Sequence, residues 1–267
     1  MAEFGAKDVK ALRDATGAGM MDAKRALTES NGDFEEAARW LRERGLGKAA
    51  ERSDRENAEG AVAVATAGNA AALVELKSET DFVAKSPQFV SMARKLAEDV
   101  AANGESAVDG YSDEIDDLKL ALKENIAVGQ VVRFEAPPGN TLETYLHVQN
   151  GRGVNAVLVE LEAGSSELAH DIAVHIAFGK PRHLTRDEVP ADEVAAERAA
   201  LEAQTRNEGK PEQALPKIVE GRLDGWYKRV PGGVLVEQPY ARDDKQTVAQ
   251  VLGAAKVVRF AQAVIGG

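Results

Sequence analysis

Residues Ala71-Ala72-Leu73-Val74-Glu75-Leu76 form a short apolar run that predicts a buried strand. Its last four residues have a counterpart in Leu158-Val159-Glu160-Leu161, 85 positions later (158 − 73). A helix-like run follows each strand, and the two helices match at an offset of 80 (172 − 92). The matching pairs are Met92-Ala93 with Ile172-Ala173, and Leu96-Ala97 with Ile176-Ala177. The chain therefore contains two related strand–helix units, which predicts an α+β fold whose core is two related α/β subdomains.

The first unit carries an insertion between its strand and its helix. The two offsets differ by five residues (85 − 80), and the extra residues fall within Ser78 to Lys85. This stretch includes Thr80-Asp81-Phe82-Val83, where an aromatic side chain follows an acid in a connection that should be polar. Phe82 either folds back into the core or is held out for a partner. An insertion that one unit lacks serves no obvious packing need, which favours an outward-facing Phe82.

The rest of the core is predicted from periodicity and turn residues. Val62 and Val64 alternate with small residues before Gly68-Asn69, which indicates a hairpin with the Ala71 strand. Ser86 and Pro87 open a helix that runs to about Ala102. Further helices are expected over 113–127, 166–179, 192–206, 211–229 and 247–254, and further strands over 129–136, 141–148, 234–236 and 256–260.

The first 45 residues predict three short helices that form a ubiquitin-associated-like bundle. Helical spacing begins with Val9, the second helix spans Met20 to Ser30, and the third ends at Gly45. Met20 and Met21 point about 100° apart on their helix. One of them can face the core, but so small a bundle does not bury both.

These patterns divide the chain into four parts. We expect an N-terminal three-helix bundle over 1–46, a charged linker over 47–59, core subdomain N over 60–140 and core subdomain C over 141–267. Subdomain C includes a helical segment over 192–229 that could form a hairpin arm.

Composition excludes several classes of function. The net charge of −11 and the sequence pI of about 5.0 argue against a nucleic-acid binder, because such proteins need a basic face. The absence of cysteine excludes disulfides, thiolate zinc sites and cysteine nucleophiles. No run approaches the roughly 20 apolar residues of a membrane span, and the N-terminus lacks the regions of a signal peptide. We therefore expect a cytoplasmic protein.

Catalytic and metal-binding motifs are missing from the sequence. It has no phosphate-binding loop, dinucleotide-binding glycine motif or nucleophile elbow. His170 and His175 are five residues apart on one expected helix, so they do not form a ligand pair at the i, i+4 spacing. The sequence therefore predicts a non-enzymatic protein that binds other proteins.

Three motifs in this order resemble the bacterial elongation factor Ts family, the guanine-nucleotide exchange factors of elongation factor Tu. The first is Leu12-Arg13 with Thr16-Gly-Ala-Gly-Met-Met-Asp22, and the second is Glu79-Thr-Asp-Phe-Val-Ala-Lys85. The third combines Glu208-Gly-Lys-Pro211 with Lys217-Ile-Val-Glu-Gly-Arg222. The match covers nearly the whole chain.

The resemblance implies a function and a set of contact residues. The family has no cofactor and performs no covalent chemistry. Asp81 and Phe82, in the loop Thr80 to Val83, would insert between two helices of the partner's nucleotide domain and disturb its magnesium site, which promotes GDP release. Leu12, Arg13, Met20 and Met21 would pack on another helix of that domain. Near His147, subdomain C would reach a separate domain of the partner.

Some features leave alternatives open. The N-terminal bundle alone is also compatible with a generic protein-binding adaptor. Segment 192–229 could be the antiparallel helical arm through which some family members form homodimers. The loop from Val148 to Val154 differs from the family pattern, and we expect no counterpart of the extra C-terminal helical module of longer members.

Overall fold

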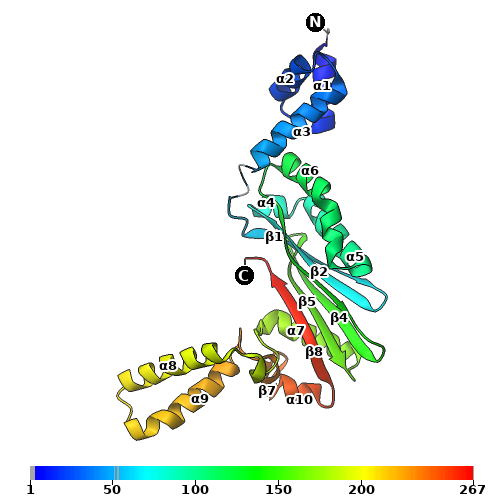
Figure 1. The fold of residues 1–267 in the computed structure, drawn as a ribbon. Coiled ribbons are helices and arrows are strands. Elements are labelled where there is room, and N and C mark those ends of the chain that lie inside the picture. The colour runs from blue at the N-terminus through cyan, green and yellow to red at the C-terminus, as the bar shows by residue number, and fades with distance from the viewer. Residues whose placement is uncertain (1–3, 51, 53, 267) are drawn as a thin grey trace.

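The computed structural model describes residues 4–50, 52 and 54–266, with side chains except those of residues 46–50. Its mixture of helices and antiparallel sheets (Figure 1) confirms the predicted α+β class. None of the helices in the described ranges combines the length and the apolar composition that a membrane span needs.

The described residues of the N-terminal part form three helices. They are α1 (Ala6–Thr16), α2 (Met20–Glu29) and α3 (Phe34–Ala50). Their shared core consists of buried side chains at Val9, Leu12, Ala23, Ala26, Leu27 and Ala37. Helix α3 does not end at Gly45 as predicted but continues to Ala50, since the lysine and alanines that follow are good helix formers. A Cβ at Gly45 would lie 2.5 Å from Leu120 Cδ2, so glycine allows α3 to approach the core closely.

The first sheet of the core has the order β1-β2-β3, with all pairs antiparallel. Its strands are β1 (Glu59–Ala67), β2 (Ala70–Ser78) and β3 (Ala127–Glu135). Helix α5 (Pro87–Asn103), the 3-10 helix η1 (Glu105–Tyr111) and helix α6 (Ser112–Leu122) pack on one face of this sheet. The Ser86 hydroxyl accepts a hydrogen bond from Phe89 N at 3.4 Å, so α5 begins as the sequence predicts.

The second sheet has the order β4-β5-β8 and is also antiparallel. Its strands are β4 (Asn140–Gln149), β5 (Arg152–Glu162) and β8 (Lys256–Val264). Helix α7 (Ser166–Gly179) and the short helix α10 (Val248–Leu252) pack on its outer face. The smaller elements are η2 (Arg186–Glu188), η4 (Leu235–Glu237), β6 (Pro239–Tyr240) and β7 (Asp243–Thr247).

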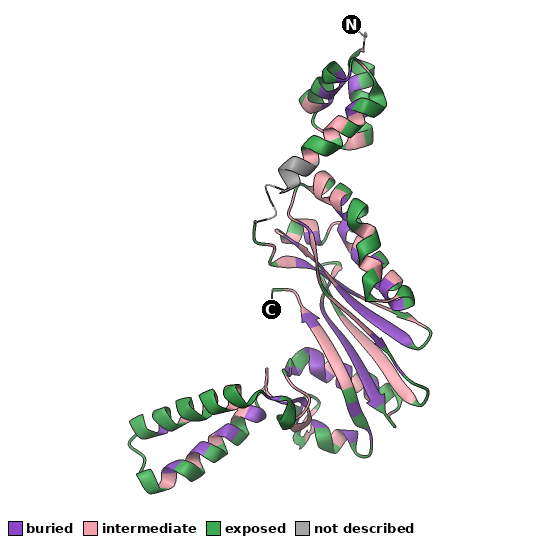
Figure 2. Ribbon diagram, in the orientation of Figure 1, coloured by how far each residue is buried: buried purple, intermediate pink, exposed green. Residues whose placement is uncertain are grey.

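The two sheets pack against each other through their inner faces. Leu73 and Leu158, the first residues of the repeated motif, are both buried between the sheets. The alternate positions Val74 and Val159 point outward to α5 and α7, respectively. The core is therefore a four-layer stack of helix, sheet, sheet and helix, in which the central strands β2 and β5 are mostly coloured as buried in Figure 2.

The glutamate of the repeated motif lies at a register shift in each sheet. Glu75 accepts a hydrogen bond from Gln130 N at 3.0 Å. Glu160 is almost fully buried, and its carboxylate accepts hydrogen bonds from Arg259 Nε and from Asn140 Nδ2, both at 2.7 Å. In both copies the carboxylate thus provides an acceptor where a bulge breaks the regular pairing.

A helical arm extends away from the core. Helices α8 (Ala191–Asn207) and α9 (Leu215–Tyr227) form an antiparallel pair, mostly exposed in Figure 2, and the 3-10 helix η3 (Glu212–Ala214) lies in their connection. At its base, His175 and Gln238 are fully buried and lie 3.0 Å apart, from Nε2 to Oε1. The Gln238 amide donates to the carbonyl oxygens of Gly179 and Arg229 at 3.0 and 3.1 Å. This amide ties the end of α7 to the segment that follows the arm.

Two further predicted elements differ in the structure. Helix α6 ends at Leu122 rather than near Ala127, because Lys123 adopts a left-handed conformation with φ 60° that terminates it. The predicted strand at 234–236 is wrong: Val234 forms only an isolated bridge to His183, and Leu235–Glu237 is a 3-10 turn. That turn buries Leu235 and brings Gln238 to the base of the arm.

Candidate functional site

The inserted stretch between β2 and α5 is a single helical turn, α4 (Asp81–Ala84), rather than the irregular loop that we expected. The Thr80 hydroxyl caps it by accepting a hydrogen bond from Val83 N at 3.4 Å. Ala84 is fully buried and Val83 is half-buried against the core of the first sheet. The Phe82 side chain, in contrast, is 74% exposed. The turn therefore anchors one side in the core and presents its aromatic ring to solvent.

Charged groups surround the exposed ring. Lys85 Nζ lies 3.0 Å from Asp81 Oδ2 and 4.2 Å from the centre of the Phe82 ring. The Asp81 carboxylate is half-exposed. Such exposed ion pairs and cation–π contacts are each worth at most about 1 kcal/mol, so a partner can displace Lys85 at little cost. Asp81 and Phe82 then become available together.

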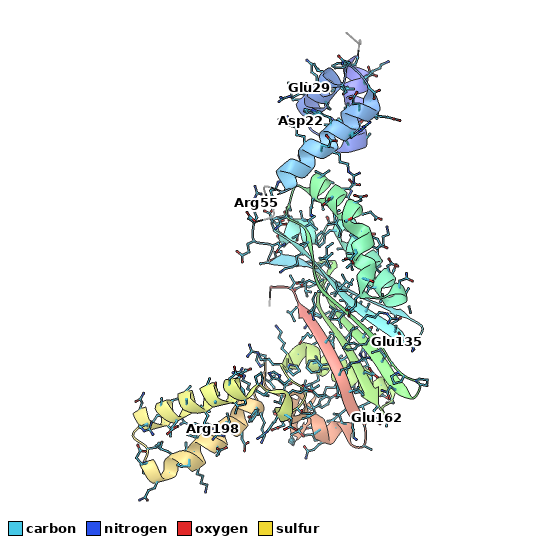
Figure 3. All side chains as sticks on the ribbon, viewed as in Figure 1. Asp22, Glu29, Arg55, Glu135, Glu162 and Arg198 are labelled. Carbon is cyan, nitrogen blue, oxygen red and sulfur yellow. The ribbon has the colours of Figure 1, made fainter. Side chains whose placement is uncertain are left out.

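A second group of residues, which sequence reasoning missed, connects α4 to the rest of the core. Glu124, in the connection between α6 and β3, contacts the backbone and hydroxyl of Thr80 and the backbone of Glu79. Arg55, at the segment joining the N-terminal bundle to the core (Figure 3), lies 3.5 Å from the Glu79 carboxylate. These residues are 24 to 45 positions from their partners, so no local pattern reveals them.

The N-terminal candidates separate into surface and core residues. Met21 is 75% exposed and Met20 is 47% exposed, so both side chains reach the surface of the bundle. Arg13 is also exposed and pairs with its neighbour Asp14 at 2.7 Å. Leu12, however, has 0% exposure and lies in the bundle core. The prediction that Leu12 contacts a partner is therefore corrected. Its side chain is buried in the bundle core, where it packs the helix that carries Arg13.

His147 is exposed near the end of β4, where a register shift separates it from Val148. The turn that follows leads to Arg152, whose guanidinium contacts Glu59 Oε2 at 2.7 Å and Gly60 O at 2.5 Å. Glu59 in turn pairs with Ser78 at the end of β2, just before α4. The β4–β5 turn and α4 thus share one end of the stacked sheets, whereas the methionines lie on the bundle beyond it (Figure 1).

The sequence of this chain is similar to that of known proteins over its whole length. A family model described as elongation factor TS matches residues 79–267. An elongation factor Ts of Acidothermus cellulolyticus is 46% identical over 280 residues, covering 100% of this chain and 99% of the relative. Those of Clavibacter michiganensis subsp. michiganensis and Micrococcus luteus are 44% and 42% identical, with both chains fully covered. The chain belongs to the elongation factor Ts family.

Membership in this family confirms the prediction of a translation elongation factor with a role in nucleotide exchange on elongation factor Tu. It does not favour a generic protein-binding adaptor. The family model begins at Glu79, so its match includes the whole of α4.

Proposed function

We propose that this chain binds the GDP-bound form of elongation factor Tu and promotes GDP release with α4 as a wedge. The observation that carries the proposal is the 74% exposure of Phe82 on a capped turn whose other side is anchored in the core. Soluble proteins do expose single aromatic side chains. An exposed ring beside a displaceable Asp81–Lys85 pair, on an insertion that the related half of the chain lacks, has the form of a contact site.

The physics of the partner's nucleotide site suits this arrangement. A bound Mg²⁺ is the largest local charge near the phosphates, so disturbing its ligands weakens a large part of the nucleotide's affinity. A rigid ring can hold two helices apart, and the Asp81 carboxylate can compete for nearby donors or cations. No covalent step is needed. By reciprocity, if this protein lowers the partner's affinity for GDP, GDP lowers the partner's affinity for this protein by the same factor.

Two further contacts support the wedge in the proposal. Met20 and Met21 offer an adaptable apolar surface on α2 of the N-terminal bundle, and Arg13 is exposed on α1 of the same bundle. His147 offers an exposed imidazole at the same end of the sheets as α4. Contacts on both sides of α4 would orient the partner so that Phe82 meets its nucleotide domain.

The proposed organisation is a bundle over 1–46, a linker over 47–59 and core subdomains over 60–140 and 141–267, although α3 continues to Ala50. The arm of α8 and α9 could join two copies of the chain, although on α8 only Thr205 is buried and its surface is largely polar. Sedimentation of the free protein would measure the oligomeric state. A cytoplasmic location fits a partner that works in translation.

The experiment that tests the proposal measures release of labelled GDP from elongation factor Tu, with and without this protein. We expect faster release that saturates with the concentration of the protein. Excess Mg²⁺ should oppose the effect if the magnesium site is the target. Release at the same rate with and without the protein would refute the proposed function.

A further inference from the structure

The connection between α6 and β3 directs a carboxylate at the start of α4. Glu124 Oε2 accepts hydrogen bonds from Glu79 N at 3.0 Å and from Thr80 N at 3.1 Å. Its other oxygen, Oε1, lies 2.5 Å from the Thr80 hydroxyl. One side chain thus satisfies three donors immediately before the turn that carries Phe82. Hydrogen bonds to an ionised acceptor are about twice as strong as neutral ones.

The contact is reciprocal. The Glu79 carboxylate accepts a hydrogen bond from Asn125 N at 2.7 Å, so each segment's glutamate binds the other segment's backbone. Asn125 Nδ2 also donates to Arg55 O at 2.7 Å, which adds the segment before β1 to the same cluster. Ile126, two residues after Glu124, is fully buried in the core of the first sheet. The cluster is therefore fixed to the core at a point that does not belong to α4.

The turn needs such support. Helix α4 has four residues, and a single helical turn is not stable alone, because nucleation costs more than its one or two hydrogen bonds return. Its apolar anchors are Val83 and Ala84, at the end of the turn. The Thr80 hydroxyl caps the turn only while it is correctly oriented, and Glu124 is the group that fixes it. Without Glu124, Thr80 would keep only its local bonds, and the Glu79–Asn125 contact would remain one residue before it.

We propose that Glu124 is a positioning residue that holds α4 in the conformation that presents Phe82 to the partner. This inference rests on the proposed function of the wedge. Glu124 itself acts through Thr80 and does not need to touch the partner. Because the turn is held before the encounter, the partner does not have to order it, and the contact energy of the ring goes into displacing nucleotide.

Glu124→Ala tests the proposal at saturating protein, where weaker binding no longer limits release. We expect the maximal stimulated rate of GDP release to fall about tenfold, as for loss of one strong charge-assisted hydrogen bond. Glu124→Gln keeps an acceptor for the two backbone donors and should retain more of the rate. Glu98→Ala, which removes an exposed carboxylate on α5, is the matched control and should match the unchanged protein.

Combining the change with Phe82→Ala separates positioning from general loss of stability. If Glu124 acts through Phe82, Glu124→Ala should slow release little further once the ring is gone. If the double variant slows release by the product of the two single fold-reductions, the two residues act independently and the proposal is overturned. A normal maximal rate of GDP release for Glu124→Ala alone would also overturn it.

Hydrogen exchange of the free protein gives a readout that does not depend on the partner. Backbone amides over residues 80–85 should exchange faster in Glu124→Ala than in the unchanged protein, while those of α5 should not change. If the amides of residues 80–85 exchange at the same rate in Glu124→Ala and in the unchanged protein, Glu124 does not position α4. This holds even if the unchanged protein stimulates GDP release. Failure of the unchanged protein to stimulate release would instead refute the proposed function and leave the exchange result to judge Glu124.

Discussion

Replacing Phe82 with alanine removes the ring that α4 holds in solvent, and the structure gives the size of the expected effect. Full burial of a phenylalanine side chain is worth about 1.5–3 kcal/mol. Because 74% of the side chain is still exposed in the free protein, most of that energy remains available for a partner. The Phe82→Ala variant should therefore raise the activation free energy of stimulated GDP release by about 1–2 kcal/mol, which corresponds to roughly 5- to 30-fold slower release.

The same exposure predicts a small effect on the fold. Phe82 contributes little buried area, and its contact with Lys85 is exposed, so the free energy of unfolding should change by no more than about 0.5 kcal/mol. Phe89, in the first turn of α5, is the opposite case because its side chain is fully buried. Phe89→Ala should lower the free energy of unfolding by about 3–5 kcal/mol. Function and stability are thus expected to separate at Phe82.

Stopped-flow release of fluorescent GDP from elongation factor Tu, together with urea unfolding, measures both quantities. Phe178→Ala is the matched control, since that ring is 62% exposed but belongs to α7 on the outer face of the second sheet. The reasoning is refuted if Phe82→Ala releases GDP at the normal rate. It is also refuted if unfolding shows a loss of several kcal/mol, which would mean that the ring is buried in solution.

Three further outcomes are expected. Replacing Met20 and Met21 together with alanine should weaken complex formation, measured by titration calorimetry, more than it weakens the free protein, because both side chains are exposed; a destabilised protein that binds normally would contradict this. Leu12→Ala should do the reverse and destabilise the bundle by about 2–5 kcal/mol in thermal unfolding, and an unchanged unfolding midpoint would place that side chain outside the core. Burial lowers the pKa of His175, so its contribution to stability is present above the ordinary histidine pKa of about 6.5 and is lost as pH falls below it. Between pH 7 and about pH 5, the free energy of unfolding measured in urea should fall more for the unchanged protein than for a His175→Gln variant. An equal fall in both proteins would contradict this role of His175.

The repeated motif made the core predictable from sequence. Leu73 and Leu158, and the alternating residues after them, carry the same burial pattern because a strand between a sheet and a helix layer must be apolar on both sides. The five-residue difference between the two copies located α4. Its helical character was missed, because Thr80 as a cap and a turn of four residues give no periodic signal.

Tertiary contacts explain most of what the sequence could not predict. Leu12 belongs to a motif that resembles a contact site, but only the packing of the bundle shows that it is buried. Glu124 needs the topology that brings the α6–β3 connection beside the end of β2, 45 residues earlier. The turn at Leu235 depends in the same way on Gln238, whose partners lie as far away as His175. Propensity describes each segment alone, whereas these roles are set by distant neighbours.

The stacking of the two sheets has a mechanical consequence for the encounter with a partner. Leu73 of one sheet and Leu158 of the other lie in one close-packed interior, and such interiors are nearly incompressible. The separation between the wedge on one half and the β4–β5 turn on the other is therefore fixed before any contact is made. A partner that touches both points must adapt its own domains to that spacing. In the proposed complex we therefore expect this protein to keep its shape and the protein that holds the nucleotide to deform.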